Sequence, residues 1–161
     1  MKKAELFPLF HALNAVASYP GAKFGYAVAK NLAKVKEECV IIEKLQEPSE
    51  EFKAYDAKRI ELCKKWAKKD EDGEPVIIGN EYDLKENMEK FKPESAALAE
   101  EYKETLDARR KVMEDVNTLL QEESDIVLHK IKEENLPEVI TGEQVMGIMA
   151  MIEDNEKETT K

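Results

Sequence analysis

The chain has 161 residues, of which 42% are hydrophobic and 37% charged, and it carries a net charge of −10. That hydrophobic fraction excludes a wholly disordered chain, and the content of six glycines and six prolines favours helices over a β-sandwich or barrel. No apolar run approaches the roughly 18 residues that a membrane-spanning helix needs, so we expect no membrane contact. The length fits a single domain, 1–161, because domains typically run to about 100–150 residues.

The charge is unevenly spread along the chain. Residues 1–46 carry seven lysines and four carboxylates, a balance of +3 that leaves −13 for the rest. An acidic protein is a poor general ligand for nucleic acid, because phosphate binding needs a concentrated positive footprint. We therefore expect no direct contact with nucleic acid. Lys23, Lys30 and Lys34 form either a small basic stripe or, as the commoner alternative, a solvated helix face.

The start of the chain does not follow the pattern of a secretory signal. Charged and polar residues and Pro8 interrupt the apolar stretch that follows Lys2 and Lys3. Cys39 and Cys63 fall on apolar helical positions, and without a signal they are predicted to be buried free thiols rather than a disulfide. We expect a protein of the cytoplasm.

The first half of the chain predicts two helical segments. An apolar N-terminal helix lies within 1–21, with Pro8 in its first turn, where proline is tolerated. A kinked helix is expected over 22–68, with a short break at 46–49 and Ser49 as the N-cap of its second piece. The first piece carries apolar residues at heptad spacing: Val28, Leu32, Val35, Cys39 and Ile42.

A turn and a β-hairpin are predicted over 69–92. Asp70-Glu71-Asp72-Gly73 signals a turn, and Gly79-Asn80 fits a two-residue hairpin turn. Because two short strands are marginal alone, a third strand or a helix should support them. The candidate is 125–132, which is rich in β-branched residues. We predict it as a strand, with a helical extension as the alternative.

The second half predicts a return helix over 93–121, with Pro93 at its favoured first position. The expected fold class is therefore mainly α: a long antiparallel helical hairpin with a small β-hairpin at its tip and short apolar terminal helices, α+β only in minor part. A capping box at Thr141 to Gln144 marks the last helix. The remaining segments are a candidate strand and turn at 122–137, a C-terminal helix within 138–153 and a frayed tail at 154–161.

No catalytic, cofactor or metal site is predicted. The acidic turn fails the spacing of a calcium-binding EF-hand loop, since Lys68 and Gly79 stand where carboxylates are required. His11 and His129 lack neighbouring ligands at metal-binding spacing. Adjacent glutamates on a helix point about 100° apart and form no acid/base pair. We expect a non-enzyme.

Candidate partner-binding residues are of two kinds. Large apolar groups on the terminal helices either fill the core or meet a partner, and methionine suits adaptable binding surfaces. Exposed carboxylates can imitate the phosphates of a nucleic acid. The apolar candidates are Phe7, Phe10, Leu13, Met146 and Met149, and the acidic candidates are Glu100, Glu101, Glu122 and Glu123.

A helix that ends in Trp66-Ala-Lys-Lys-Asp-Glu-Asp-Gly-Glu-Pro75 is followed by a hairpin, a second long helix, a Leu136-Pro137 turn and a short apolar helix. This order, over roughly 22–152, resembles a family of small phage-encoded proteins of uncharacterised function from bacteriophages of Gram-positive bacteria. The resemblance implies a viral origin and expression in the cytoplasm of the bacterial host. It transfers no catalytic residue.

The leading functional hypothesis is a non-enzymatic accessory protein, of an assembly or chaperone-like kind, that binds a phage or host protein through its hairpin and terminal helices. The heptad stripes pair either within one chain or between two chains as a homodimer. The alternative hypothesis is an inhibitor of bacterial immunity, of the anti-CRISPR or anti-restriction type, whose acidic surfaces act as a nucleic-acid mimic.

Overall fold

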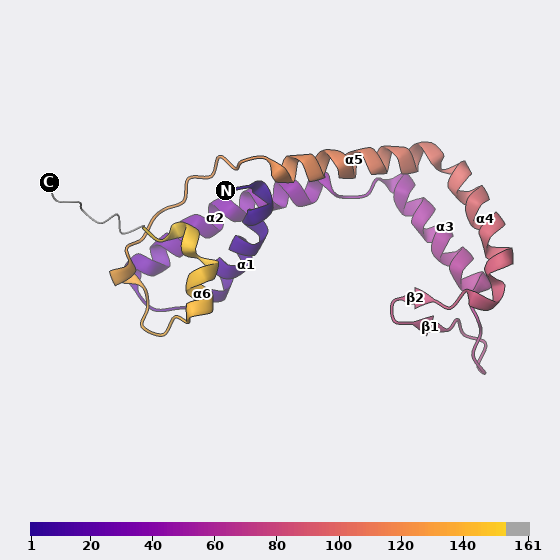
Figure 1. The fold of residues 1–161 in the computed structure, drawn as a ribbon, viewed down its shortest axis with the longest axis horizontal. Helices are drawn as coiled ribbons and strands as arrows, with labels where there is room; N and C mark the ends of the chain where they lie inside the picture. Colours follow the sequence, from indigo (N-terminus) through magenta and orange to yellow (C-terminus); the bar gives the residue numbers. More distant parts are fainter. Residues whose placement is uncertain (154–161) are drawn as a thin grey trace. The chain divides into compact units, whose positions relative to one another are not determined.

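The structure is a computed structural model that describes residues 1–153 (Figure 1). Whereas the sequence predicts one domain, the contacts gather into two compact units. The terminal unit contains Met1–Leu45 and the chain from Val116 onward, and the central unit contains Gln46–Asp115. The predicted frayed tail, 154–161, lies outside the described residues.

The predicted fold class is confirmed: the protein is mainly α with a small antiparallel hairpin. The break between the second and third helices is also confirmed, and Ser49 Oγ accepts a hydrogen bond of 3.2 Å from the backbone N–H of Phe52 as N-cap. The α-helices are α1 Leu6–Val16, α2 Ala22–Leu45, α3 Glu50–Trp66, α4 Met88–Glu101, α5 Lys103–Gln121 and α6 Gly142–Gly147. The strands are β1 Ile77–Ile78 and β2 Glu81–Tyr82, and the 3-10 turns are η1 Lys3–Glu5, η2 Lys85–Asn87, η3 Glu133–Asn135 and η4 Met149–Met151.

The core of the protein lies in the terminal unit, where α1, α2 and α6 pack together. One face of α1 is buried because its apolar residues recur at helical spacing. α1 and α6 approach each other closely, since a Cβ built on Gly147 would lie 2.8 Å from Ala12 Cβ. Glycine is therefore required there for the two helices to touch. The buried side chains of this core are Leu6, Leu9, Leu13, Val16, Phe24, Ala27, Val28, Val35, Cys39, Ile131, Ile148, Met151 and Ile152.

The segment 125–132, predicted as a strand that supports the hairpin, is neither a strand of that sheet nor a helix. It belongs to the terminal unit, whereas the hairpin belongs to the central unit. We call residues 124–132 the extended segment. Its contact of strand type is a single parallel bridge between Ile131 and Ile152. The β-branched residues favour extended backbone, but the extended segment lies against a helix and does not pair with a strand.

That helix is α2, and Asn31 is the residue that holds the extended segment. The Asn31 side chain is fully buried, with 0% exposure. Its Nδ2 donates to the His129 carbonyl at 2.9 Å, and its Oδ1 accepts from the His129 N–H at 2.7 Å. One amide thus satisfies both backbone groups of one residue, as a neighbouring strand would. Lys34 Nζ adds a hydrogen bond of 2.7 Å to the carbonyl of Val127.

In the central unit, α3 and α4 form an antiparallel helical hairpin (Figure 1). Lys58 pairs with Glu101 at 2.7 Å, and Lys65, further along α3, pairs with Glu94, earlier on α4, at 2.7 Å. Higher numbers on one helix thus meet lower numbers on the other, which fixes the antiparallel direction. The prediction of a helical hairpin therefore applies to α3 and α4 inside this unit.

The predicted start of the return helix at Pro93 is wrong, because α4 begins at Met88 and contains Pro93. Proline costs an interior helix one hydrogen bond, but the start of α4 is fixed by other contacts. Asn87 Nδ2 donates to the Trp66 carbonyl at 2.9 Å and so closes the open end of α3. The return helix is also split: Tyr102 leaves helical geometry, with φ −106° and ψ 21°, between α4 and α5.

The C-terminal helix is shorter than the predicted 138–153. Its start is as predicted, since Gln144 N donates to Thr141 Oγ1 at 3.3 Å and Thr141 N donates to Gln144 Oε1 at 3.0 Å. α6 ends at Gly147, and η4 continues the chain as a 3-10 turn. Glycine lowers the stability of a helix, but a glycine is needed at position 147 because Ala12 leaves no room for a larger side chain.

The β-hairpin is as predicted around Gly79-Asn80. Ile77 pairs with Tyr82 and Ile78 with Glu81. Gly79 has φ +64°, a conformation that glycine adopts without strain, as the first residue of a two-residue hairpin turn.

We predict that Asn31→Ala lowers the free energy of unfolding by about 2–3 kcal/mol, because it leaves the backbone groups of His129 without partners. The control is Asn14→Ala. Asn14 makes one exposed hydrogen bond of 2.8 Å to the carbonyl of Phe10, so its loss should change stability by less than about 0.5 kcal/mol. Urea unfolding followed by circular dichroism measures both. Equal losses in the two variants would contradict the role given to Asn31.

We predict that Gly147→Ala lowers the free energy of unfolding by about 1–3 kcal/mol, because its methyl group meets Ala12. Gly142 begins the same helix, and a Cβ at that position would have no atom within 4 Å. Gly142→Ala should therefore be neutral or stabilise by up to about 1 kcal/mol. Ala12→Gly should restore part of the loss in the Gly147→Ala chain. Thermal melting of the three variants and the unaltered chain tests this, and no rescue in the double variant would mean that the clash is not the cause.

Candidate partner-binding surfaces

The base of the hairpin is braced by the residues that follow α3. Lys68 N donates to the Asp83 carbonyl at 2.7 Å, Val76 N donates to the Lys68 carbonyl at 2.8 Å, and Asp83 N donates to the Val76 carbonyl at 2.9 Å. A further bridge joins Lys69 to Pro75. The sheet has only two strands within the described residues, and the support that such a short hairpin needs comes from this short stretch after α3 rather than from 125–132.

The tip of the hairpin is apolar and uncovered. Ile77 is 58% exposed and Ile78 is 57% exposed. Because successive residues of a strand point to opposite faces, neither face of β1 is covered at this point. Large exposed apolar groups on a braced element indicate a contact surface. Sequence reasoning placed these isoleucines in a strand but missed their exposure, since β-branched residues normally face a core.

A groove runs beside the hairpin on the central unit, with a volume of about 510 Å³. Its walls come from α3, the hairpin and the start of α4, and Arg59, Asn80 and Glu81 contribute polar groups to a lining that is otherwise largely apolar. Arg59 is already engaged, since its Nε and Nη2 donate to Asp56 Oδ1 at 3.0 and 2.9 Å. The other residues that line the groove are Ile60, Cys63, Tyr82, Leu84 and Phe91.

Next to the hairpin base, Trp66 lies between charged groups. Lys65 Nζ is 4.7 Å and Lys90 Nζ 5.6 Å from the indole centroid. The pKa of Glu94 is lowered, first by the hydrogen bonds from Lys65 and then by the nearby indole N–H. That N–H is buried and has no partner at good hydrogen-bond geometry within residues 1–153. These contacts hold α3 against α4 and suggest no chemistry.

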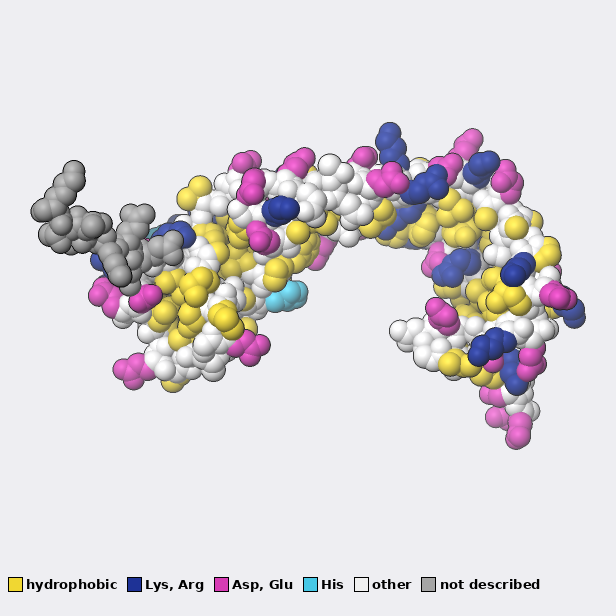
Figure 2. All heavy atoms as spheres, in the orientation of Figure 1, with side chains coloured by type: hydrophobic (Ala, Val, Ile, Leu, Met, Phe, Trp, Pro, Cys, Tyr) yellow, Lys and Arg dark blue, Asp and Glu magenta, His cyan; other side chains and the backbone are white. Residues whose placement is uncertain are grey.

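The five apolar candidates named from sequence separate into three groups. Leu13, with 0% exposure, belongs to the core, so its assignment to a partner surface is wrong. Phe7 and Phe10 are half-buried and pack on that core. Met146 and Met149 are 68% and 52% exposed. Figure 2 shows hydrophobic side chains gathered over α6, where Met146 lies.

The exposed methionines stand on a firmly anchored stretch. Ile148 and Met151, which alternate with them, are fully buried. The buried side chains fix the backbone of this short stretch, while the exposed methionines, whose side chains are flexible, form a surface that can adapt to a partner. We call Met146 and Met149 the methionine surface.

The four acidic candidates are divided between the units, and each is near a cation of its own chain. In the central unit Glu101 pairs with Lys58 at 2.7 Å, and Glu100 with Lys103 at 3.4 Å. In the terminal unit Glu122 pairs with Lys3 at 2.9 Å, and Glu123 with the N-terminal ammonium at 2.6 Å. The pKa of Glu123 is lowered by that hydrogen bond. The structure therefore offers no specific observation in favour of phosphate mimicry by these residues.

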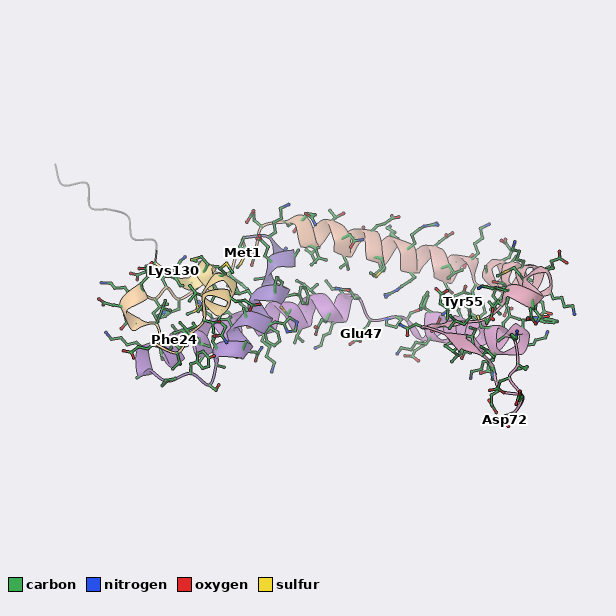
Figure 3. The ribbon with its side chains drawn as sticks, turned by 60° about the horizontal axis from the view of Figure 1, so that its bottom comes forward. Met1, Phe24, Glu47, Tyr55, Asp72 and Lys130 are labelled. Carbon is green, nitrogen blue, oxygen red and sulfur yellow. The ribbon has the colours of Figure 1, made fainter. Side chains whose placement is uncertain are left out.

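The acidic turn between α3 and β1 is a tight turn that is stabilised by hydrogen bonds within the turn. Asp70 Oδ1 accepts from the N–H groups of Asp72 and Glu74 at 3.0 and 2.9 Å, and Gly73 has φ +85°. Figures 2 and 3 show acidic side chains at its end, with Asp72 pointing into solvent. Across residues 1–153, no group of three or more His, Cys, Asp or Glu side chains is arranged to hold a metal ion.

Comparisons with protein-family models, with curated proteins and with solved structures returned no match for this chain. Within the described part of the chain, no helix combines the length and the apolar character that crossing a membrane requires.

Both cysteines are free thiols, as predicted, and both are buried. Burial, with smaller contributions from Glu43 and Glu38, raises the pKa of the Cys39 thiol. Because the thiolate is the reactive form, Cys39 is not an activated nucleophile.

We predict that Cys39, studied in a Cys63→Ser chain, reacts with a disulfide reagent at neutral pH about tenfold or more slowly in the folded than in the unfolded protein, since both its thiolate fraction and its access fall. Absorbance of the released thiolate measures the rate. Equal rates in the two states would contradict the buried placement of Cys39.

Proposed function

We propose that the chain is a non-enzymatic accessory protein that acts by binding another protein, with the hairpin tip of the central unit as its principal contact. The observation that carries the proposal is the pair of exposed isoleucines, Ile77 and Ile78, on a hairpin whose base is braced by backbone hydrogen bonds. The proposal keeps the setting that the family resemblance implies, a phage-encoded factor of an assembly or chaperone-like kind in a bacterial host.

The hairpin tip exposes apolar surface that no other part of the central unit covers. A hairpin with two-residue strands has little stability of its own, yet the contacts of Lys68 hold this one in place. Ordering the hairpin leaves more than half of each isoleucine in water. On binding, burial of that exposed part would add about 1–2 kcal/mol for each side chain. A preorganised apolar tip also loses little conformational entropy when a partner covers it.

The groove beside the tip extends the same surface. Ile60, Leu84 and Phe91 line it, so an apolar side chain of the partner would find apolar walls, with polar groups at Asn80 and Glu81 to orient it. The methionine surface of the terminal unit is a second, separate apolar contact that the same partner or another would use.

The test is affinity purification of the tagged chain from the cells that express it naturally, with mass spectrometry of the proteins that accompany it. We predict that Ile77→Thr/Ile78→Thr removes the principal partner, because threonine keeps the strand preference while removing the apolar contact. Two lost apolar anchors should weaken binding by about tenfold or more. Met146→Ser/Met149→Ser tests the methionine surface in the same experiment.

The matched control is Val112→Thr. Val112 is an exposed β-branched residue of the central unit that lies on α5, away from the hairpin in sequence. The Val112→Thr variant should retain every protein partner that the unaltered chain binds. If the isoleucine variant has an unchanged circular dichroism spectrum and still recovers the same partners, the proposal is wrong.

A further inference from the structure

Two stretches of this acidic chain contain no carboxylate at all. Residues 23–36 and 126–132 together hold six lysines and no aspartate or glutamate. The first stretch belongs to α2, and the second is most of the extended segment. In a chain with a net charge of −10, such a separation leaves a local excess of positive charge that the total conceals.

The fold places these two stretches against each other. The buried Asn31 of α2 holds His129 by two hydrogen bonds, and the ring of His129 lies edge-on to that of Tyr26 with centroids 5.5 Å apart. On α2, Lys23, Tyr26 and Lys30 follow at steps of three and four and so share one face. The extended segment adds its own lysines beside this face.

A pocket of about 300 Å³ opens between the two stretches. Lys23 lines it from α2 and Lys130 and Lys132 from the extended segment, while Glu134 and Glu153 are the carboxylates on its wall. Figure 3 shows Lys130 and Phe24 at the same end of the terminal unit. The remaining residues of the lining are Tyr26, Ala27, His129, Ile131 and Asn135.

The lysines here are not engaged by carboxylates of the described chain. Among residues 1–153, Lys23, Lys30 and Lys132 make no ion pair with a carboxylate. Lys130 Nζ donates to the Ala150 carbonyl at 2.8 Å, which orients the ammonium without neutralising it. This differs from the central unit, where Lys53, Lys64 and Lys68 each pair with a glutamate at 2.6–2.9 Å.

The surface also presents an aromatic ring. Tyr26 is 55% exposed and has Lys30 Nζ at 5.5 Å from its ring centroid. Lysines around an exposed aromatic ring suit a single strand of nucleic acid, because its phosphates bind cations and its unpaired bases stack on aromatic rings. An acidic peptide would use the lysines and leave the ring unused, and a duplex hides its base faces. The acidic remainder of the protein is screened at distances beyond about 8 Å at physiological salt.

We propose that this surface binds single-stranded nucleic acid, with phosphates on Lys23, Lys30 and Lys132 and a base stacked on Tyr26. The proposal does not depend on the protein-binding function of the hairpin, which belongs to the other unit, and it departs from the expectation that an acidic chain avoids nucleic acid. Asn135, beside the pocket, supplies an amide that can hydrogen-bond the edge of the stacked base.

The test is fluorescence anisotropy of the full chain with a labelled oligothymidylate of about ten nucleotides, within the range that such sites cover. Lys23→Gln/Lys30→Gln/Lys132→Gln should weaken binding at least about tenfold and lower the dependence of log K on log salt by about 2, since each phosphate contact on a single strand contributes about 0.7. The matched control, Lys53→Gln/Lys64→Gln/Lys68→Gln, makes the same change in total charge and should bind like the unaltered chain.

Tyr26 separates stacking from charge. Tyr26→Ala should weaken binding by about five- to 150-fold, whereas Tyr26→Phe, which keeps the ring, should bind nearly as well as the unaltered chain. Circular dichroism of each variant checks that it is folded.

Three results would overturn the proposal. The first is that the unaltered chain does not bind the oligonucleotide at low salt. The second is that the control triple variant loses as much affinity as the test variant, which would show that binding is non-specific electrostatic attraction. The third is equal affinity for the matching duplex or for polyglutamate, which would assign the lysines to general anion binding.

Discussion

The backbone of His129 has one buried partner, the side-chain amide of Asn31, and the terminal unit depends on this contact. It is made at both ends of the amide, with the oxygen at 2.7 Å from the His129 nitrogen and the nitrogen at 2.9 Å from the His129 oxygen. Only one orientation of the amide satisfies both groups. A buried asparagine without these partners would destabilise the fold, so the contact favours one position of the extended segment over its alternatives.

That position determines what the terminal unit can do. Two residues beyond His129, Ile131 N donates to the Met151 carbonyl at 2.9 Å, and Glu153 N donates to the Ile131 carbonyl at 2.8 Å. The apolar side of the segment thus closes the core, while Lys130 and Lys132 are exposed and line the same pocket as Lys23 of α2. One hydrogen-bonded contact therefore supports both the core and the basic surface proposed to bind a single strand.

The central unit is built on a different principle. Its buried apolar residues, within the described chain, are Cys63 and Ala67 alone. Its aromatic groups are half-buried, as where Tyr55 lies 5.6 Å from Tyr102 between α3 and α4. Exposed ion pairs add little to stability, so the backbone contacts around Lys68 and the cap that Asn87 gives to α3 carry much of its order. A unit with so small a core belongs to the less stable part of a protein.

Local signals were predictable from sequence. Ser49, Gly79 and the capping box at Thr141 act on the neighbouring backbone, so their residue types alone predict a helix start, a turn and a second helix start. The predictions that were wrong concern segments whose structure depends on residues far away in the sequence. The choice of α2 rather than a sheet as the neighbour of 125–132 depends on Asn31, about a hundred residues earlier, and an isolated asparagine in a helix gives no sign of it.

The candidate sites show the same division. Leu13 and Met149 look alike in sequence as apolar residues of amphipathic stretches, and only packing separates a core residue from an exposed one. The exposure of Ile77 and Ile78 was missed because β-branched residues normally signal burial. Sequence analysis offered Lys23, Lys30 and Lys34 as a possible basic stripe on one helix, but it did not bring Lys130 and Lys132 to that stripe. Only the fold places 126–132 against α2.

In the terminal unit a helix side chain, and not a strand, holds the extended segment. Amide hydrogen exchange, measured residue by residue by NMR over 124–132, tests this arrangement. Slow exchange is predicted at His129 and Ile131, whose N–H groups donate to Asn31 Oδ1 and the Met151 carbonyl. Fast exchange is predicted at Leu128 and Lys130, whose N–H groups have no acceptor within the described residues. Slow exchange at all four would indicate a helix or a two-sided strand and contradict the account, as would fast exchange at His129.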